Sequence, residues 1–105
     1  MLNFKLRLYA KMAITVKFVG AFRHFSGVGE LALDCKGYVS IGELVNELVK
    51  EVPNLKRSLI DRQFEDPRPN ALILVNGREI GVLNGLETKL KDGDEIVFVP
   101  VVHGG

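Results

Sequence analysis

The sequence contains a single cysteine, Cys35, and no tryptophan. One cysteine forms no intramolecular disulfide and supplies no cysteine-rich metal site, and an iron–sulfur ferredoxin, which needs four, is excluded. Nothing near Cys35 in the sequence would lower its thiol pKa, so we interpret it as a small apolar side chain at the end of a strand. A lone thiol fits a reducing compartment, and we expect the protein in the cytoplasm.

The sequence also lacks an excess of charge of one sign and a long apolar run. Its net charge is +1, with both signs mixed along 105 residues. Proteins that bind nucleic acid or anionic membranes concentrate positive charge, and a membrane helix needs about 20 apolar residues. We therefore expect partners that are neither nucleic acid nor membrane. No pair of histidines has ligand spacing, so we expect no metal.

The N-terminal segment alternates apolar and polar residues up to Tyr9, which is the periodicity of a strand. A second methionine, Met12, follows and is an alternative start of the chain. Two interpretations stay open for residues 1–12: an extra edge strand, or an extension ahead of the start at Met12. We predict one domain over residues 13–99 and a C-terminal tail over residues 100–105.

Residues 13–99 contain one strong helix signal among several strand signals. Ser40 and Glu43 form a capping box, and the apolar residues that follow fall on one stripe as far as Val49. Pro53 ends this helix. A weaker helix is predicted over residues 54–64.

Alternation and turn residues predict the strands. They cover residues 13–19, 29–35, 71–75, 78–80 and 95–99, with a loop over residues 20–28. Asn76-Gly77 marks a tight hairpin turn, and Asp92 and Asp94 are interpreted as turn residues. The fold class is α+β: a mixed sheet of four to five strands with one main helix packed on one face. Long connections separate the first and last strands, so a parallel pairing between them is permitted.

The last strand is apolar on both faces, which is typical of the centre of a sheet. Val97 and Val99 alternate with Ile96 and Phe98. One helix layer covers only one face of a sheet, so the other face exposes apolar surface unless the N-terminal segment covers it. Such surfaces mark partner sites, and we predict docking here.

The tail follows this strand directly as Pro100, Val101, Val102, His103, Gly104 and Gly105. Extended from Val101, it reaches about 16–18 Å. Two terminal glycines let the backbone pass through a channel too narrow for a Cβ atom. A free carboxylate is a poor electrophile, so acyl chemistry there needs activation, for example by adenylation. The sequence has no phosphate-binding Gly-x-x-x-x-Gly-Lys loop, so the chain is expected to bind no cofactor and a partner to use the ATP.

Residues 90–105, with the sequence LKDGDEIVFVPVVHGG, closely resemble the C-terminus of the small subunit of molybdopterin synthase. Residues 14–25, with Arg23 after an apolar strand, are similar to the opening segment of that family. The resemblance implies a ubiquitin-like β-grasp fold. It also implies a cycle in which a ubiquitin-activating-type enzyme adenylates Gly105 and sulfur replaces AMP to give a thiocarboxylate. The loaded tail then enters the large subunit of molybdopterin synthase and donates sulfur to a pterin precursor.

The resemblance also assigns roles to individual residues. Gly105 accepts and donates sulfur. Gly104 lets the backbone pass through a narrow channel, and residues 100–103 form the tail before it. Arg23 and Phe98 are partner contacts, although Arg23 is equally a solvated loop charge. We interpret His103 as an exposed tail residue that packs against a partner.

Three classes of function stay open. The first is the molybdopterin sulfur carrier, the small subunit of a synthase that is not catalytic alone. The second is a carrier for thiamin or tRNA thiolation, or a modifier joined to lysines of other proteins. The third is a non-catalytic β-grasp interaction domain, for which Gly105 would be dispensable.

Overall fold

The structure, a computed structural model, describes residues 11–36 and 39–102. The first strand begins at Lys11. The extension or extra strand predicted ahead of it, and the tail positions His103, Gly104 and Gly105, lie outside the described residues.

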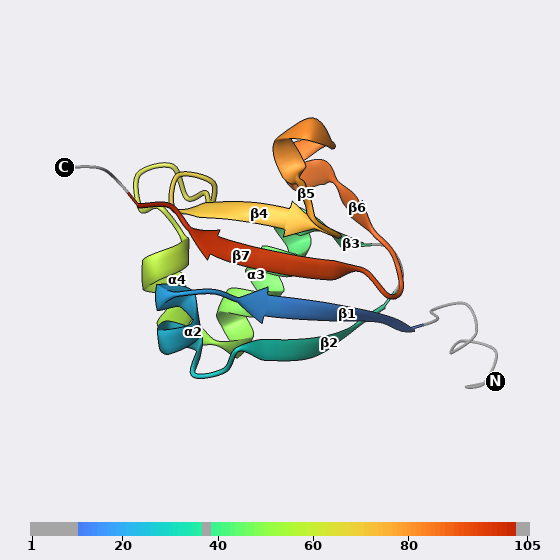
Figure 1. Ribbon diagram of the computed structural model, residues 1–105, viewed down its shortest axis with the longest axis horizontal. Helices are drawn as coiled ribbons and strands as arrows, with labels where there is room; N and C mark the ends of the chain where they lie inside the picture. The colour runs from blue at the N-terminus through green and yellow to red at the C-terminus, as the bar shows by residue number, and fades with distance from the viewer. Residues whose placement is uncertain (1–10, 37–38, 103–105) are drawn as a thin grey trace.

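A mixed sheet of five strands forms one layer of the domain (Figure 1). Its order is β2-β1-β7-β4-β5, so β7 lies at the centre. The strands are β1 (Lys11–Phe18), β2 (Glu30–Lys36), β4 (Ala71–Val75), β5 (Arg78–Glu79) and β7 (Glu95–Pro100).

The first and last strands of the sheet, β1 and β7, form the parallel pair that the sequence permits, with Val16 beside Ile96 and Phe18 beside Phe98. β7 is antiparallel to β4 on its other side. β1 and β2 form an antiparallel pair, and β4 and β5 form a hairpin around Asn76-Gly77, where both residues have positive φ.

The described residues form three α-helices. They are α2 (Ala21–Ser26), α3 (Ile41–Glu51) and α4 (Pro53–Leu59). Figure 1 shows α3 behind the sheet and α2 and α4 at the end of the sheet from which the chain leaves toward its C-terminus. The predicted capping box starts α3: the Ser40 hydroxyl accepts from the Glu43 N–H at 3.2 Å, and the Glu43 carboxylate accepts from the Ser40 N–H at 2.9 Å.

The hydrophobic core lies between α3 and the sheet. The predicted apolar stripe of α3 is buried at Ile41, Leu44, Val45 and Leu48. From the central strand, Phe98 is fully buried and stacks on Phe18 with ring centroids 6.0 Å apart. Among residues 11–36 and 39–102, no helix lies on the other face of the sheet (Figure 1).

The segment predicted as a loop over residues 20–28 contains the helix α2, so that prediction was wrong. Gly20 and Gly27 bound the helix with φ values of 58° and 79°. Phe22, which is 2% exposed, anchors it in the core. So short a helix has little stability of its own, and tertiary packing holds it.

The second helix differs from its prediction at both ends. α4 begins at Pro53, where a missing N–H costs nothing, and ends at Leu59, not at residue 64. Phe64 lies in a turn beyond it and is 66% exposed.

Several short elements were not predicted. β3 (Val39–Ser40) pairs with β6 (Lys89–Leu90) as a second sheet, and the 3₁₀ helices η1 (Ile80–Val82) and η2 (Gly85–Glu87) follow β5. They are too short for a periodic sequence signal. Asp92 and Asp94 are turn residues, as predicted: Asp92 accepts from the Ala13 N–H at 2.7 Å, and the buried Asp94 accepts from Asn76 Nδ2 at 2.9 Å.

Over the described ranges, no helix is long and apolar enough to cross a membrane. The same ranges contain no group of three or more His, Cys, Asp or Glu side chains placed to hold a metal ion.

Truncation of a side chain should change the free energy of unfolding by different amounts on the two faces of β7. Phe98→Ala empties a fully buried site beside Phe18 and should lower the free energy of unfolding by about 3–5 kcal/mol. Val99→Ala, on the uncovered face of the same strand, should lower it by about 1 kcal/mol. Urea denaturation measures both, and equal losses would contradict this assignment of the core.

Candidate functional site: the C-terminal tail and the uncovered sheet face

The tail leaves the body of the protein from the end of the central strand (Figure 1). Pro100 lies opposite Ala71, and the Val101 N–H donates to the Asn70 carbonyl at 3.0 Å. Strand pairing therefore continues through Pro100, and one further backbone hydrogen bond follows it at Val101. Val101 is 40% exposed and Val102 is 87% exposed, so the free tail starts at Val102.

The acceptor of this last backbone hydrogen bond is held by its own contacts. Asn70 donates from Nδ2 to the Leu59 carbonyl at 3.3 Å, which ties it to the end of α4. Asp66 accepts from the Arg68 backbone N–H at 2.7 Å and forms an ion pair with its guanidinium, which orders the preceding turn. The Arg68 guanidinium also lowers the pKa of the Asp66 carboxyl.

On the other side of Pro100 lies Gly20, the residue that starts α2. A Cβ built on Gly20 would lie 3.2 Å from Pro100 Cγ, and Gly20 has a φ of 58°. Both the left-handed backbone and the close approach favour glycine here. The start of α2 therefore packs directly against the base of the tail.

The face of the sheet opposite the helices carries an apolar stripe over β4 and β7. Cross-strand pairs place Leu72 beside Val99 and Leu74 beside Val97. Leu72 is 41% exposed and the other three are half-buried. The prediction that Val97 and Val99 face away from the helix layer is confirmed. The two leucines were not predicted as part of this face, because residues 71–75 are apolar throughout and show no alternation.

An ion pair borders the stripe on the side of β1. Lys17 Nζ lies 2.9 Å from Glu95 Oε2, and Lys17 is opposite Val97 in the strand register. The hydrogen bond to Glu95 raises the pKa of the Lys17 ammonium. An apolar centre beside a polar rim is the usual anatomy of a protein–protein contact.

The other residues singled out from the sequence lie outside the tail and outside the apolar stripe. Arg23 is exposed in the last turn of α2, with its guanidinium against Gly29. Phe98 is fully buried, so its ring is not available to a partner, and the prediction of a contact there is corrected. His24 is exposed and lies edge-on to Phe25, 5.4 Å between ring centroids. Burial raises the pKa of the half-buried Cys35 thiol, which agrees with an apolar role.

The fold is a ubiquitin-like β-grasp: a mixed sheet packs on one main helix. The other face of the sheet is apolar, and the tail leaves from its central strand. Residues 16–105 match the sequence profile of the ThiS family. The chain belongs to this family of ubiquitin-like sulfur carriers and modifiers.

Individual relatives agree with this placement. The chain is 30% identical over 94 residues to small archaeal modifier protein 3 of Haloferax volcanii, covering 90% of this chain and 100% of the relative. It is 31% identical over 99 residues to ubiquitin-related modifier 1 of Mus musculus, covering 91% and 98%. The solution structure of small archaeal modifier protein 1 from Methanosarcina acetivorans superposes with a TM-score of 0.77 at 32% identity, covering 90% of this chain and 98% of that one.

The contact between Gly20 and Pro100 can be tested with a matched pair. Gly20→Ala and Gly27→Ala both place alanine at positive φ, which costs about 1–2 kcal/mol. A Cβ at Gly27 meets nothing within 4 Å, whereas one at Gly20 meets Pro100. Gly20→Ala should therefore be the less stable variant and should alone shift the Val101 amide resonance in NMR spectra. Equal stability with an unmoved Val101 signal would contradict this contact.

Proposed function

We propose that this chain carries sulfur as a thiocarboxylate on the C-terminal Gly105. The observation that carries the proposal is the exit of the tail from the central strand, with its last backbone anchor at Val101 and Val102 exposed. A reactive carboxylate at the end of such a tail can enter another protein while the folded domain stays outside. Membership of the ThiS family supports this use of the terminus.

The chemistry takes two substitutions. A carboxylate oxygen of Gly105 attacks the α-phosphorus of ATP, and pyrophosphate leaves to give an acyl-adenylate. A sulfur nucleophile then attacks the acyl carbon, the C–S bond forms, and the C–O bond to AMP breaks. Hydrosulfide as the nucleophile gives the thiocarboxylate directly. A persulfide gives an acyl disulfide instead; a thiol then attacks the donor's sulfur, the S–S bond breaks, the thiocarboxylate leaves and the thiol and the donor are joined in a disulfide. The adenylate makes AMP the leaving group, which a free carboxylate lacks.

A partner supplies the nucleotide site in this proposal, and the chain binds no cofactor. A ubiquitin-activating-type adenylating enzyme would dock on the stripe of Leu72, Leu74, Val97 and Val99, and burial of this stripe would provide the apolar part of the contact. Gly104 and Gly105 then thread a narrow channel to the nucleotide, with His103 packing at its entrance.

The destination of the sulfur in our first candidate is molybdopterin. The loaded tail would enter the large subunit of molybdopterin synthase, and the chain would act as the sulfur-donating small subunit, not as a catalyst alone. The similarity of residues 90–105 to that family's C-terminus supports this assignment.

A second candidate is a protein modifier or a carrier for thiolation of tRNA. It is favoured by relatives that are named modifiers, in Haloferax volcanii and Mus musculus. Both candidates share the adenylated glycine and differ in the acceptor, which is a pterin precursor in one and a lysine amine or a tRNA base in the other. Incubating the loaded chain with each acceptor system distinguishes them.

Sulfur loading is tested by intact-mass analysis. After incubation with ATP, a sulfur source and an adenylating enzyme of the same organism, the chain should gain the mass of one oxygen-to-sulfur exchange. Removal of Gly105, or extension beyond it by one residue, should abolish the gain because the reacting carboxylate is displaced. Loading that persists in either variant would overturn the assignment of the sulfur to Gly105, and a wild-type chain that stays unloaded would favour the third class, an interaction domain with a dispensable terminus.

Docking on the stripe is tested with charged substitutions. Val97→Asp and Val99→Asp should each weaken binding to the adenylating enzyme by at least about tenfold, or 1.4 kcal/mol, because a carboxylate would be buried in an apolar contact. Ala32→Asp is the matched control, since Ala32 lies on the same face but on the edge strand β2. Isothermal titration calorimetry measures the affinities. Unchanged affinity for both valine variants would exclude this surface.

A further inference from the structure

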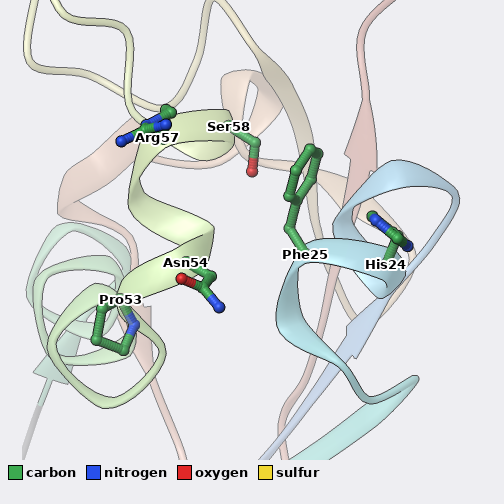
Figure 2. Close-up of a pocket in the computed structure, with 6 residues that line it drawn as sticks. All are labelled: His24, Phe25, Pro53, Asn54, Arg57 and Ser58. Carbon is green, nitrogen blue, oxygen red and sulfur yellow. The ribbon is translucent and has the colours of Figure 1, made fainter.

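A groove lies between α2 and α4, on the side of the domain that the sheet-face contact leaves free. Its volume is about 590 Å³. Figure 2 shows the ring of Phe25 standing between the two helices, with Ser58 and Asn54 of α4 facing it. The groove is lined by His24, Phe25, Pro53, Asn54, Arg57 and Ser58.

The apolar part of the groove is an aromatic ring that the fold leaves accessible. Phe25 is 42% exposed, although its neighbour Phe22 on the same short helix is 2% exposed. His24 contacts the ring edge-on at 5.4 Å between centroids. An exposed ring held between two helices is the kind of residue that anchors a partner side chain.

Arg57 is the charged side chain among the residues that line the groove, and His24 is a second base there. Arg23 in the last turn of α2 and Lys56 in the last turn of α4 lie next to these two residues in the sequence and do not line the groove. Arg57 and Lys56 form no ion pair within residues 11–36 and 39–102. No carboxylate lines the groove.

Carboxylates do line a neighbouring hollow that Arg57 also borders. They are Asp61 and Glu65, and the Asp61 carboxylate accepts from the backbone N–H groups of Gln63 and Phe64 at 3.0 and 2.9 Å. This carboxylate is therefore committed to its own turn. No ion pair of Arg57 with Asp61 or Glu65 is present among the described residues.

The groove lies at the end of the domain from which the tail leaves. α2 starts at Gly20, which packs against Pro100, and Val19 donates its N–H to the Phe98 carbonyl at 3.2 Å. An enzyme that takes up the tail has to approach this end of the molecule. The groove is therefore within reach of the same partner, next to the base of the tail.

We propose that this α2–α4 groove docks an acidic segment, bearing at least one apolar side chain, of the adenylating enzyme that takes up the tail. This inference rests on the proposed function. The apolar side chain packs on Phe25, and the carboxylates pair with Arg57 and the neighbouring bases. Complementary charge of this kind speeds association and makes it sensitive to salt.

The decisive variants are Arg57→Glu and Phe25→Ala. Each should weaken binding of the adenylating enzyme by about tenfold or more at low salt. Arg57→Glu should also flatten or reverse the dependence of affinity on NaCl concentration, because it replaces an attractive charge in the contact with a repulsive one. Arg78→Glu is the matched control: it makes the same change of charge at the start of β5, beyond the hairpin turn at the opposite end of the sheet, and should leave affinity unchanged.

Calorimetric titration of each variant with the adenylating enzyme that loads the wild-type chain gives the affinities, at several salt concentrations. Thermal unfolding confirms that each variant is folded. Arg57→Gln, which places no acid at the C-terminal end of α4, serves if Arg57→Glu does not fold. At saturating enzyme, intact-mass analysis should still show sulfur loading of the variants, because the tail is intact.

The outcomes separate this inference from the proposed function. A wild-type chain that no adenylating enzyme loads overturns the proposed function and the groove assignment together. Normal loading of the wild type with unchanged affinity and salt dependence for Arg57→Glu and Phe25→Ala overturns the groove alone. Binding of a transfer RNA, added as a probe, that is lost in Arg57→Glu would identify a different class of partner and would also overturn it.

Discussion

The parallel pairing of β1 with β7 is the constraint on which the rest of the structure depends. It places the last strand between β1 and β4, so β7 pairs with β1 from Glu95 to Phe98 and with β4 from Ile96 to Pro100. Phe98 can then fill the core against Phe18, while Val97 and Val99 are presented on the opposite face. The tail therefore starts at the end of the central strand, which is paired with a strand on each side.

The base of the tail is defined by short contacts from three directions. Asn70 accepts its last backbone hydrogen bond, Gly20 admits the ring of Pro100, and the end of α4 supports Asn70 through the Leu59 carbonyl. None of these residues has a chemical role of its own. Together they separate a fixed body from a segment that begins at Val102, and this separation is what a carrier with a terminal reactive group requires.

Much of this architecture could be predicted from the sequence because it rests on periodicity and capping. The box of Ser40 and Glu43, the stripe of α3 and the alternation of Val97 and Val99 are local signals that tertiary structure did not override. The helix α2 was missed because its stability comes from burial of Phe22 by distant residues. Phe98 was assigned to a contact by family resemblance, although its alternation with Val97 and Val99 already placed it on the covered face. The groove at Phe25 and Arg57 joins two segments far apart in the sequence, which no linear pattern reveals.

The hydrogen bond from Val101 to Asn70 has a geometric consequence for any enzyme that receives this chain. It is the last anchored point of the backbone, from which the reach of the tail is measured. Each residue beyond it adds at most about 3.3–3.6 Å, so the terminal carbon has a fixed maximum distance from the docked domain. Under the proposed function, the catalytic centre of the adenylating enzyme would lie within this reach of the docked domain.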